Sequence, residues 1–410
     1  MSSERSGPAA AARAVELAAR DSYGRLVAWL TSRCGDIAMA EDAMADALER
    51  ALLTWPEQGI PARPETWLLT TARRRVIDGA RRKETRTRAV DRLRVEAEEA
   101  VNTPFRRALP DRRLELMVLC AHPDIGVGVR TPLILQTVLG LDAKRIGEAF
   151  LVAPATMGQR LVRAKRQIRD MGLSLELPEP SDLGERLPHV LEAIYAAYGT
   201  GWDGAMDEGA RGLSEEALWL ARLVVHALPE EPEALGLLAL ISFAESRRAA
   251  RRTPGGLFIP LDEQDTALWD HDLMLEGEKA VWIAAKYTNP GRFQIEASIQ
   301  SVHAHRARSG RTDWPAIHRM YATLTRFYPS IGATIGYAAS FGSLDRVHDG
   351  LAVLDGLSAE KVARHQPYWA VRAHLLRRAG DVAAADIALE RAIGLSEDPA
   401  VRAWLLASRT

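Results

Sequence analysis

The 410-residue sequence contains two cysteines and no long apolar run. Cys34 and Cys120 are too few for a disulfide framework, and neither has a Cys-x-x-Cys or Cys/His spacing that would hold zinc. Both are expected to be small core residues of a protein in the reducing cytoplasm. Nowhere do about eighteen uncharged apolar residues follow one another, which argues against a membrane span. Charges scattered among the first apolar residues likewise argue against a signal peptide.

Net charge is also nearly absent, at −1, but the charges are unevenly distributed. Residues 1–172 hold 29 Lys and Arg against 22 Asp and Glu, whereas residues 173–410 hold 24 against 32. The basic part is suited to bind a polyanion and the acidic part is not. Because a chain of this length exceeds one ordinary core, we expect two or three domains and two functions.

Apolar residues recur with the period of a helix throughout the chain, which predicts an all-α protein. Residues 12–34 are expected to form one helix, Asp36 to cap a second, and a third to begin near Glu65. From Pro178 onward, helices alternate with loops marked by Gly and Pro.

The end of the chain contains one match to a 34-residue helical repeat. The residues at the offsets of the tetratricopeptide pattern are Trp369, Ala373, Gly380, Ala385, Leu389 and Ala392. A weaker copy precedes it, and no third is in register, so residues 180–300 are predicted to be helical without a clear repeat.

The stretch Asp142–Asp170 is predicted to be a helix-turn-helix. Asp142 is suited to cap the first helix, and Pro154 to begin the second, since its missing N–H would be unpaired there. Along the second helix Met157, Leu161, Ala164 and Ile168 share one face. The other faces are polar and basic, as a DNA-reading helix requires, although an ordinary amphipathic helix would have the same pattern. Gly158 is unfavourable inside a helix and suggests a close neighbour.

The predicted third helix is unusually basic. Ten of the 22 residues from Arg73 to Arg94 are Lys or Arg. Such a run is usually a solvated face, but here it adjoins Trp55 and Trp67. Aromatic planes beside positive charge are what single-stranded DNA binds.

Two clusters of residues suggest a metal site or an enzyme active site. His122 near Cys120 suggests a metal ligand, but no further ligand lies at a suitable spacing, so a packed or capping histidine is favoured. The acids and His271 in residues 261–277 suggest an enzyme, but acids at helix N-termini or a docking surface explain them as well. No catalytic residue, metal or cofactor is predicted.

Two motifs in order carry a resemblance to a known family. They are W-L-L-T-x-A-R-R-R-x-I-D-x-x-R-R, beginning at Trp67, and A-T-M-x-Q-R-L-V-R-A-K-R-x-I-R, beginning at Ala155. The chain resembles the extracytoplasmic-function (ECF) sigma factors of bacterial RNA polymerase, in the subgroup with a long tetratricopeptide-like tail. The resemblance implies sigma region 2 at residues 12–84, a charged linker at 85–109, sigma region 4 at 110–172 and a regulatory helical domain at 180–410.

The resemblance also implies partners and sites. The partners are promoter DNA and core RNA polymerase, through its β′ clamp helices and β flap, with no membrane. The expected polymerase-binding residues are Asp42, Asp46 and Glu49. The expected minus-10 residues are Trp67, Arg74, Arg75, Arg81 and Arg82, beside a base-capturing loop at residues 55–64. The expected minus-35 residues are Thr156, Gln159, Arg160 and Arg163 at the bases, with Lys165 and Arg166 at phosphates.

Physical chemistry agrees with this division, because Arg and Gln pair bidentately with guanine and adenine in the major groove. Relatives usually have an acidic residue where this chain has Ala153, Pro154 and Ala155, so the minus-35 preference is left open. The attached tail allows an intramolecular contact with the sigma domains. The alternative hypothesis is a stand-alone helix-turn-helix regulator with a sensing tail, which would not need the acidic helix or the Trp/Arg helix.

Overall fold

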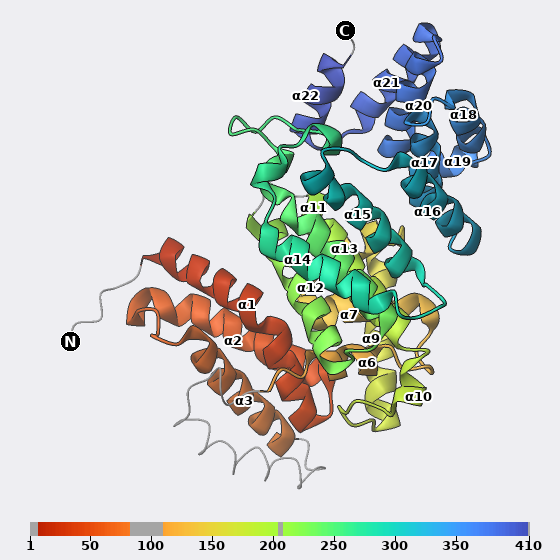
Figure 1. Cartoon of the computed structure of the whole chain (residues 1–410). Helices are drawn as coiled ribbons and strands as arrows, with labels where there is room; N and C mark the ends of the chain where they lie inside the picture. The colour runs from red at the N-terminus through yellow and green to blue at the C-terminus, as the bar shows by residue number, and fades with distance from the viewer. Residues whose placement is uncertain (1–6, 83–109, 204–207, 409–410) are drawn as a thin grey trace. The chain divides into compact units, whose positions relative to one another are not determined.

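The structure is a computed structural model that describes residues 7–82, 110–203 and 208–408 (Figure 1). Within these ranges the chain is helical and has no strand, and an isolated bridge joins Arg252 to Phe258. The all-α prediction is therefore confirmed. The expected linker at residues 85–109 lies outside the described residues.

The chain divides into two compact units, Met1–Leu220 and Ala221–Thr410. The boundary falls within α12, so the domain expected at residues 180–410 contributes its first helices to the first unit. The helices of the first unit are α1 (Pro8–Cys34), α2 (Ile37–Gln58), α3 (Pro64–Arg82), α6 (Arg113–Cys120), α7 (Val127–Leu139), α8 (Ala143–Ala149), α9 (Pro154–Met171), α10 (Pro180–Leu183), α11 (Leu187–Asp203) and the first part of α12 (Glu208–Ala227).

Helices α1–α3 form what we call the first helical group. Gly35 ends α1 in the left-handed conformation, with φ of 67°, and its N–H donates to the carbonyl of Thr31. Asp36 then caps α2 as predicted, its side chain accepting from the N–H of Met39 at 3.2 Å. The three helices pack on one another around Trp55 and Leu68, which are 1% and 0% exposed.

Helices α6–α9 form the second helical group, and α7 is its centre. This helix packs on α6, α8 and α9, and also on α1 of the first group and on α11. The side chain of Arg113, on α6, is buried and pairs with Asp111 at 2.6 Å and with Glu216 of α12. Arg130 of α7 lies 3.0 Å from the ring of His189 on α11. The second group is thus covered by α11 and α12.

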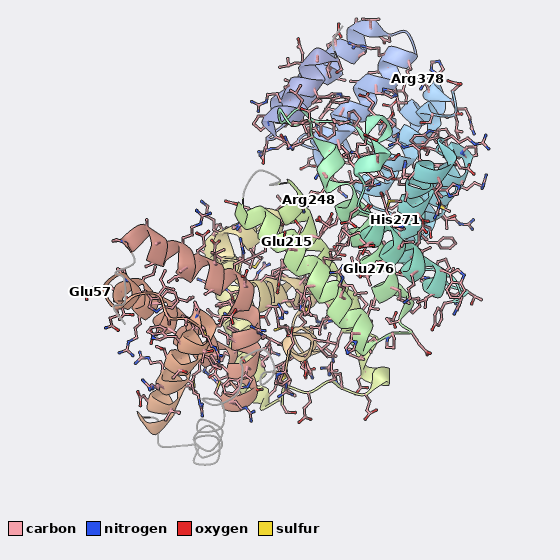
Figure 2. All side chains as sticks on the ribbon, turned by 60° about the vertical axis from the view of Figure 1, so that its left-hand side comes forward. Glu57, Glu215, Arg248, His271, Glu276 and Arg378 are labelled. Atoms are coloured by element: carbon pink, nitrogen blue, oxygen red, sulfur yellow. The ribbon has the colours of Figure 1, made fainter. Side chains whose placement is uncertain are left out.

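The second unit consists of helices that pack on their neighbours in sequence. They are α13 (Pro232–Ser246), η1 (Arg248–Arg251), η2 (Leu261–Glu263), η3 (Thr266–Leu268), α14 (His271–Ala284), α15 (Arg292–Ser309), α16 (Trp314–Phe327), α17 (Ile331–Gly342), α18 (Val347–Asp355), α19 (Ala359–Val362), α20 (Gln366–Arg378), α21 (Val382–Leu395) and α22 (Pro399–Ala407). Glu276 of α14, labelled in Figure 2, accepts a hydrogen bond from Arg222 at 2.8 Å and another from Ser242 of α13 at 3.0 Å.

The segment with the repeat match forms the helix pair α20 and α21. Gly380 lies at their turn with φ of 85°, a conformation that favours glycine. Ala373, Ala388, Leu389 and Ala392 form the buried contact between the two helices, together with Leu405 of α22. Small residues at these positions let the helices approach closely.

Candidate nucleic-acid and polymerase interface

Helix α9 separates an apolar face from a polar one, as its sequence predicts. Met157, Leu161, Ala164 and Ile168 are all buried. Most of the expected DNA-binding side chains are exposed, namely Thr156, Gln159, Arg160, Arg163 and Arg166. Pro154 is the first residue of α9, and no acidic side chain lies in its first turn. This end of the helix thus presents positive charge and polar groups without a competing carboxylate.

The turn between α8 and α9 depends on a glycine that the sequence analysis did not single out. The side chain of Asp142 caps α8 as predicted, at 2.8 Å from the N–H of Arg145. A Cβ at Gly147 would lie 2.6 Å from the carbonyl oxygen of Val152, so only glycine fits there. At Gly158 the nearest atom to such a Cβ is in the Ala143 side chain, at 3.9 Å. The close approach expected at Gly158 is therefore found at Gly147 instead.

Lys165 differs from the other expected DNA-binding residues. It is 8% exposed, and its ammonium group forms an ion pair with Glu41 of α2. In this arrangement Lys165 faces a carboxylate of the first helical group, so the expected phosphate contact is not available to it. The reason is its place on α9 beside the buried seam, where α9 packs on α2.

The basic helix α3 presents only part of its charge to solvent. Arg74 and Arg75 are exposed, whereas Arg73 is buried. Trp67 is half-buried and meets Trp55 edge-to-face, with ring centroids 5.5 Å apart and planes at 74°. Because Trp55 is a core residue, it offers no open plane to a base, and the expectation of two stacking tryptophans is wrong for this one. The side chains of Arg81 and Arg82 lie outside the described part of the chain.

The acidic face expected on α2 is only partly free. Asp42 and Glu49 are exposed, whereas Asp46 is half-buried and forms an ion pair with Arg75 of α3. This pair connects a residue expected to bind polymerase with one expected to bind DNA. A surface ion pair of this kind contributes little to stability, so a stronger partner can displace it.

Residues of the two clusters that suggested a metal site or an active site form backbone hydrogen bonds and helix caps. The Nδ1 atom of His122 accepts from the N–H of Asp124 at 3.2 Å. Asp265 caps η3 at 2.9 Å from the N–H of Ala267, and Asp270 caps α14 at 3.0 Å from that of Leu273. No group of three His, Cys, Asp or Glu placed to hold a metal ion occurs in the described ranges. Nor does any helix there combine the length and apolar character needed to cross a membrane.

Comparison with known proteins assigns a family to the chain. Residues 19–87 match sigma-70 region 2, and residues 186–285 match a family of unknown function, DUF6596. A protein of Rhizobium meliloti (strain 1021) described as "Uncharacterized protein R00370" is 32% identical over 379 residues, which cover 90% of this chain and 88% of that protein. The chain belongs to the same family as this Rhizobium protein and carries a sigma-70 region 2. No solved structure matches it significantly.

The first helical group is the part of the chain that matches sigma-70 region 2. Sigma-70 family members are transcription initiation factors rather than enzymes, and region 2 implies binding to core RNA polymerase and promoter DNA. The match spans most of α1, all of α2 and α3, and therefore the acidic face as well as Trp67, Arg74 and Arg75. The DUF6596 match spans α11 to α14, including the helices that cover the second helical group.

Glu41 of α2 is not among the acids expected to bind polymerase, and the structure gives it a different position from theirs. The carboxylate is buried against Lys165, which lies 124 residues away in sequence. Burial raises the pKa of Glu41 above its ordinary value even though Lys165 lies against it. No local pattern indicates this pairing, since Glu41 and Asp42 are neighbours of similar chemistry.

Proposed function

We propose that this protein is an RNA polymerase sigma factor of the ECF type, which binds core polymerase, opens a promoter and starts transcription. The sigma region 2 match is the observation that carries the proposal. The exposed set on α9 supports it, because a promoter-recognition subunit needs a second module for duplex DNA. In this proposal the second helical group is sigma region 4 and contacts the minus-35 element.

Polymerase binding is assigned to the face of α2 that carries Asp42 and Glu49. Both carboxylates are exposed on one side of the helix, and they suit a basic partner such as the β′ clamp helices. Asp46 would join them when Arg75 turns from it toward DNA. The exposed Arg74 and the half-buried Trp67 would then lie beside the opened minus-10 strand.

The tail is assigned a regulatory role that begins with its first helices. Glu216 and Trp219 of α12 bind Arg113 and Asp111 of the second helical group, with the Trp219 Nε1 atom 3.3 Å from Asp111. Removing everything after Gly172 would take Glu216 from the buried Arg113 and Trp219 from Asp111. A tetratricopeptide-like domain in the second unit would then bind the regulating partner.

Transcription in vitro with core polymerase tests the function. The full chain, mixed with core enzyme and fragmented genomic DNA, should produce transcripts that begin at a limited set of sites. Reversing both charges with Asp42→Lys and Glu49→Lys should weaken the complex with core enzyme by at least about tenfold in affinity. The control is Glu16→Lys, which reverses an exposed acid of α1 that is not assigned to polymerase binding. Absence of a stable complex between the unaltered chain and core enzyme would refute the proposal.

The DNA-binding assignment on α9 has its own test. Replacing Arg160 and Arg163 by Ala should cost about 1–3 kcal/mol each in promoter binding while core binding is unchanged. If the second helical group binds a duplex specifically without any polymerase, the protein acts instead as a stand-alone regulator.

A further inference from the structure

The contact between α2 and α9 has features that suit a switch. It joins the helix proposed to bind polymerase with the helix proposed to read duplex DNA. There the buried Lys165 forms an ion pair with Glu41, whose side chain is 14% exposed. A second, looser pair joins Arg169 of α9 to Asp36 of α2 at 3.9 Å.

The central pair is incompletely satisfied. The Oε1 atom of Glu41 is buried and has no hydrogen-bond partner among the described residues. A buried charged group recovers much of its hydration free energy when it becomes exposed to water. An ion pair in which one carboxylate oxygen has no hydrogen bond therefore holds its two helices together only weakly. Lys165 would regain water, or a phosphate, by the same movement.

Close backbone packing between α1 and the end of α7 also joins the two helical groups. Gly24 of α1 meets the C-terminal end of α7, and a Cβ at this position would overlap the carbonyl oxygen of Val138. A Cβ at Gly140, which follows α7, would lie 3.3 Å from the ring of Tyr23. The two helical groups therefore meet closely at glycines, where added side-chain volume would force them apart.

The closed arrangement is incompatible with a promoter. Elements named minus-10 and minus-35 are about 25 base pairs apart, or roughly 85 Å at about 3.4 Å per base pair. Helix α9 has 18 residues and spans about 27 Å at 1.5 Å per residue. While α9 contacts α2, one molecule cannot place its two groups on both elements.

We propose that the Lys165–Glu41 contact is an autoinhibitory clasp that holds the two helical groups together until the protein engages polymerase and promoter. The inference rests on the proposed function and adds regulation to it. Because Glu41 and Asp42 are adjacent on α2, a partner bound at Asp42 acts directly beside the clasp. Lys165 then changes partner from a carboxylate to the DNA backbone.

A distance measurement tests the clasp without polymerase. Spin labels are placed at Leu53 of α2 and Val162 of α9, which are 68% and 66% exposed, in the full chain with Cys34→Ser and Cys120→Ala. The unaltered contact should give one short distance. Glu41→Gln should increase the open-to-closed ratio about tenfold, because Lys165 is left buried without its partner. Gly24→Ala should open the contact by a steric route, with Glu41 and Lys165 themselves unaltered.

Controls separate the clasp from general destabilisation. Glu16→Gln removes an exposed acid of α1 and should leave the short distance unchanged. The exchange Glu41→Lys with Lys165→Glu should restore it, although each single change opens the contact. If neither Glu41→Gln nor Gly24→Ala produces a longer distance, the clasp is overturned.

Transcription distinguishes failure of the clasp from failure of the function. With limiting protein and unaltered cysteines, Glu41→Gln should raise initiation by core polymerase about threefold or more relative to the unaltered chain. Opening without any gain in initiation would overturn the autoinhibitory role while the sigma function stands. If the unaltered chain fails to bind core polymerase, the proposed function fails whatever the distances show.

Discussion

Two helix contacts in this protein are built from different kinds of side chain. One joins α2 to α9, and the other joins α20 to α21. The first contains a largely buried charged pair, Lys165 and Glu41. The second buries alanine and leucine side chains, among them Ala388 and Leu389. When helices part, charged groups regain water whereas apolar groups lose their burial. The α2–α9 contact is therefore suited to open and close, and the α20–α21 contact to stay closed.

The first unit and the tail also differ in how deeply their other ion pairs are buried. Arg113 is buried between Asp111 and Glu216 in the first unit. Although burial opposes it, the hydrogen bonds and charge of Arg113 hold the pKa of Asp111 below its usual range. In the α17–α21 part of the tail, pairs such as Arg378 with Asp345 stay at the surface. Buried charges make the first unit sensitive to single substitutions that the tail surface would tolerate.

A charge placed in the α20–α21 contact should have the largest effect. Ala392 is fully buried, so Ala392→Asp should destabilise the tail by about 4 kcal/mol or more, since the new carboxylate has no partner there. Denaturant unfolding of the full chain, followed by circular dichroism, measures the change. Ala383→Asp, at an exposed position of α21, is the control and should stay near the unaltered value. An equal loss of stability in Ala392→Asp and Ala383→Asp would contradict the claim that the α20–α21 contact depends on apolar burial.

Removal of the buried arginine should have the next largest effect. Arg113→Met should destabilise the first unit by about 3 kcal/mol, because Asp111 and Glu216 would face each other without the intervening charge. Thermal unfolding of the full chain measures it. Arg145→Met removes an exposed arginine of α8 and is expected to change little. An Arg113→Met protein as stable as the control would mean that α12 does not hold the second helical group.

One tail histidine should make tail stability depend on pH. Burial, with the charges of Arg247 and Arg306 nearby, lowers the pKa of His303 to about 4. An unfolded histidine titrates near 6.5 and so binds a proton that the folded state excludes. Stability should therefore be lost as pH falls from about 6.5 toward 4, by about 2 kcal/mol after discounting for partial exposure. His303→Gln should flatten the pH dependence of tail unfolding, and an unchanged slope would show that other groups cause it.

A surface pair in the tail should have the smallest effect. Arg378, labelled in Figure 2, forms an ion pair with Asp345, whose Oδ1 atom lies 2.5 Å from the Arg378 Nη2 atom. The two side chains are 40% and 88% exposed. Arg378→Ala should change the free energy of unfolding by less than about 1 kcal/mol, because water solvates each charge almost as well as its partner does. A larger loss in the same unfolding assay would show that surface pairs also hold the tail.

Much of the fold follows from residues close together in sequence. The caps at Asp36 and Asp142 and the seam of α9 were predicted because each depends on residues three or four positions apart. The first of the two sigma motifs lies within the region 2 match, whereas the ECF subgroup stays a prediction. Whether the α9 residues read the minus-35 element stays a prediction.

Other features depended on contacts between distant segments. Trp55 and Trp67 looked alike in sequence, but the packing of α1–α3 buries Trp55 and leaves Trp67 half-buried. Likewise, α11 and α12 looked like the start of a separate tail domain. Burial of Arg113 against Glu216 joins them to the second helical group.

The sequence by itself determined that the chain is helical, where several helices begin and end, and which face of α9 is apolar, because these depend on backbone preference and helical period. Only the tertiary structure decided which charges are buried. Lys165 and Arg166 are neighbours of like charge, and the packing of α9 on α2 puts one against Glu41 and leaves the other in water. Lys165 and Glu41 are 124 residues apart in sequence. Their pairing depends on how whole helices pack, and a local sequence pattern does not specify that packing.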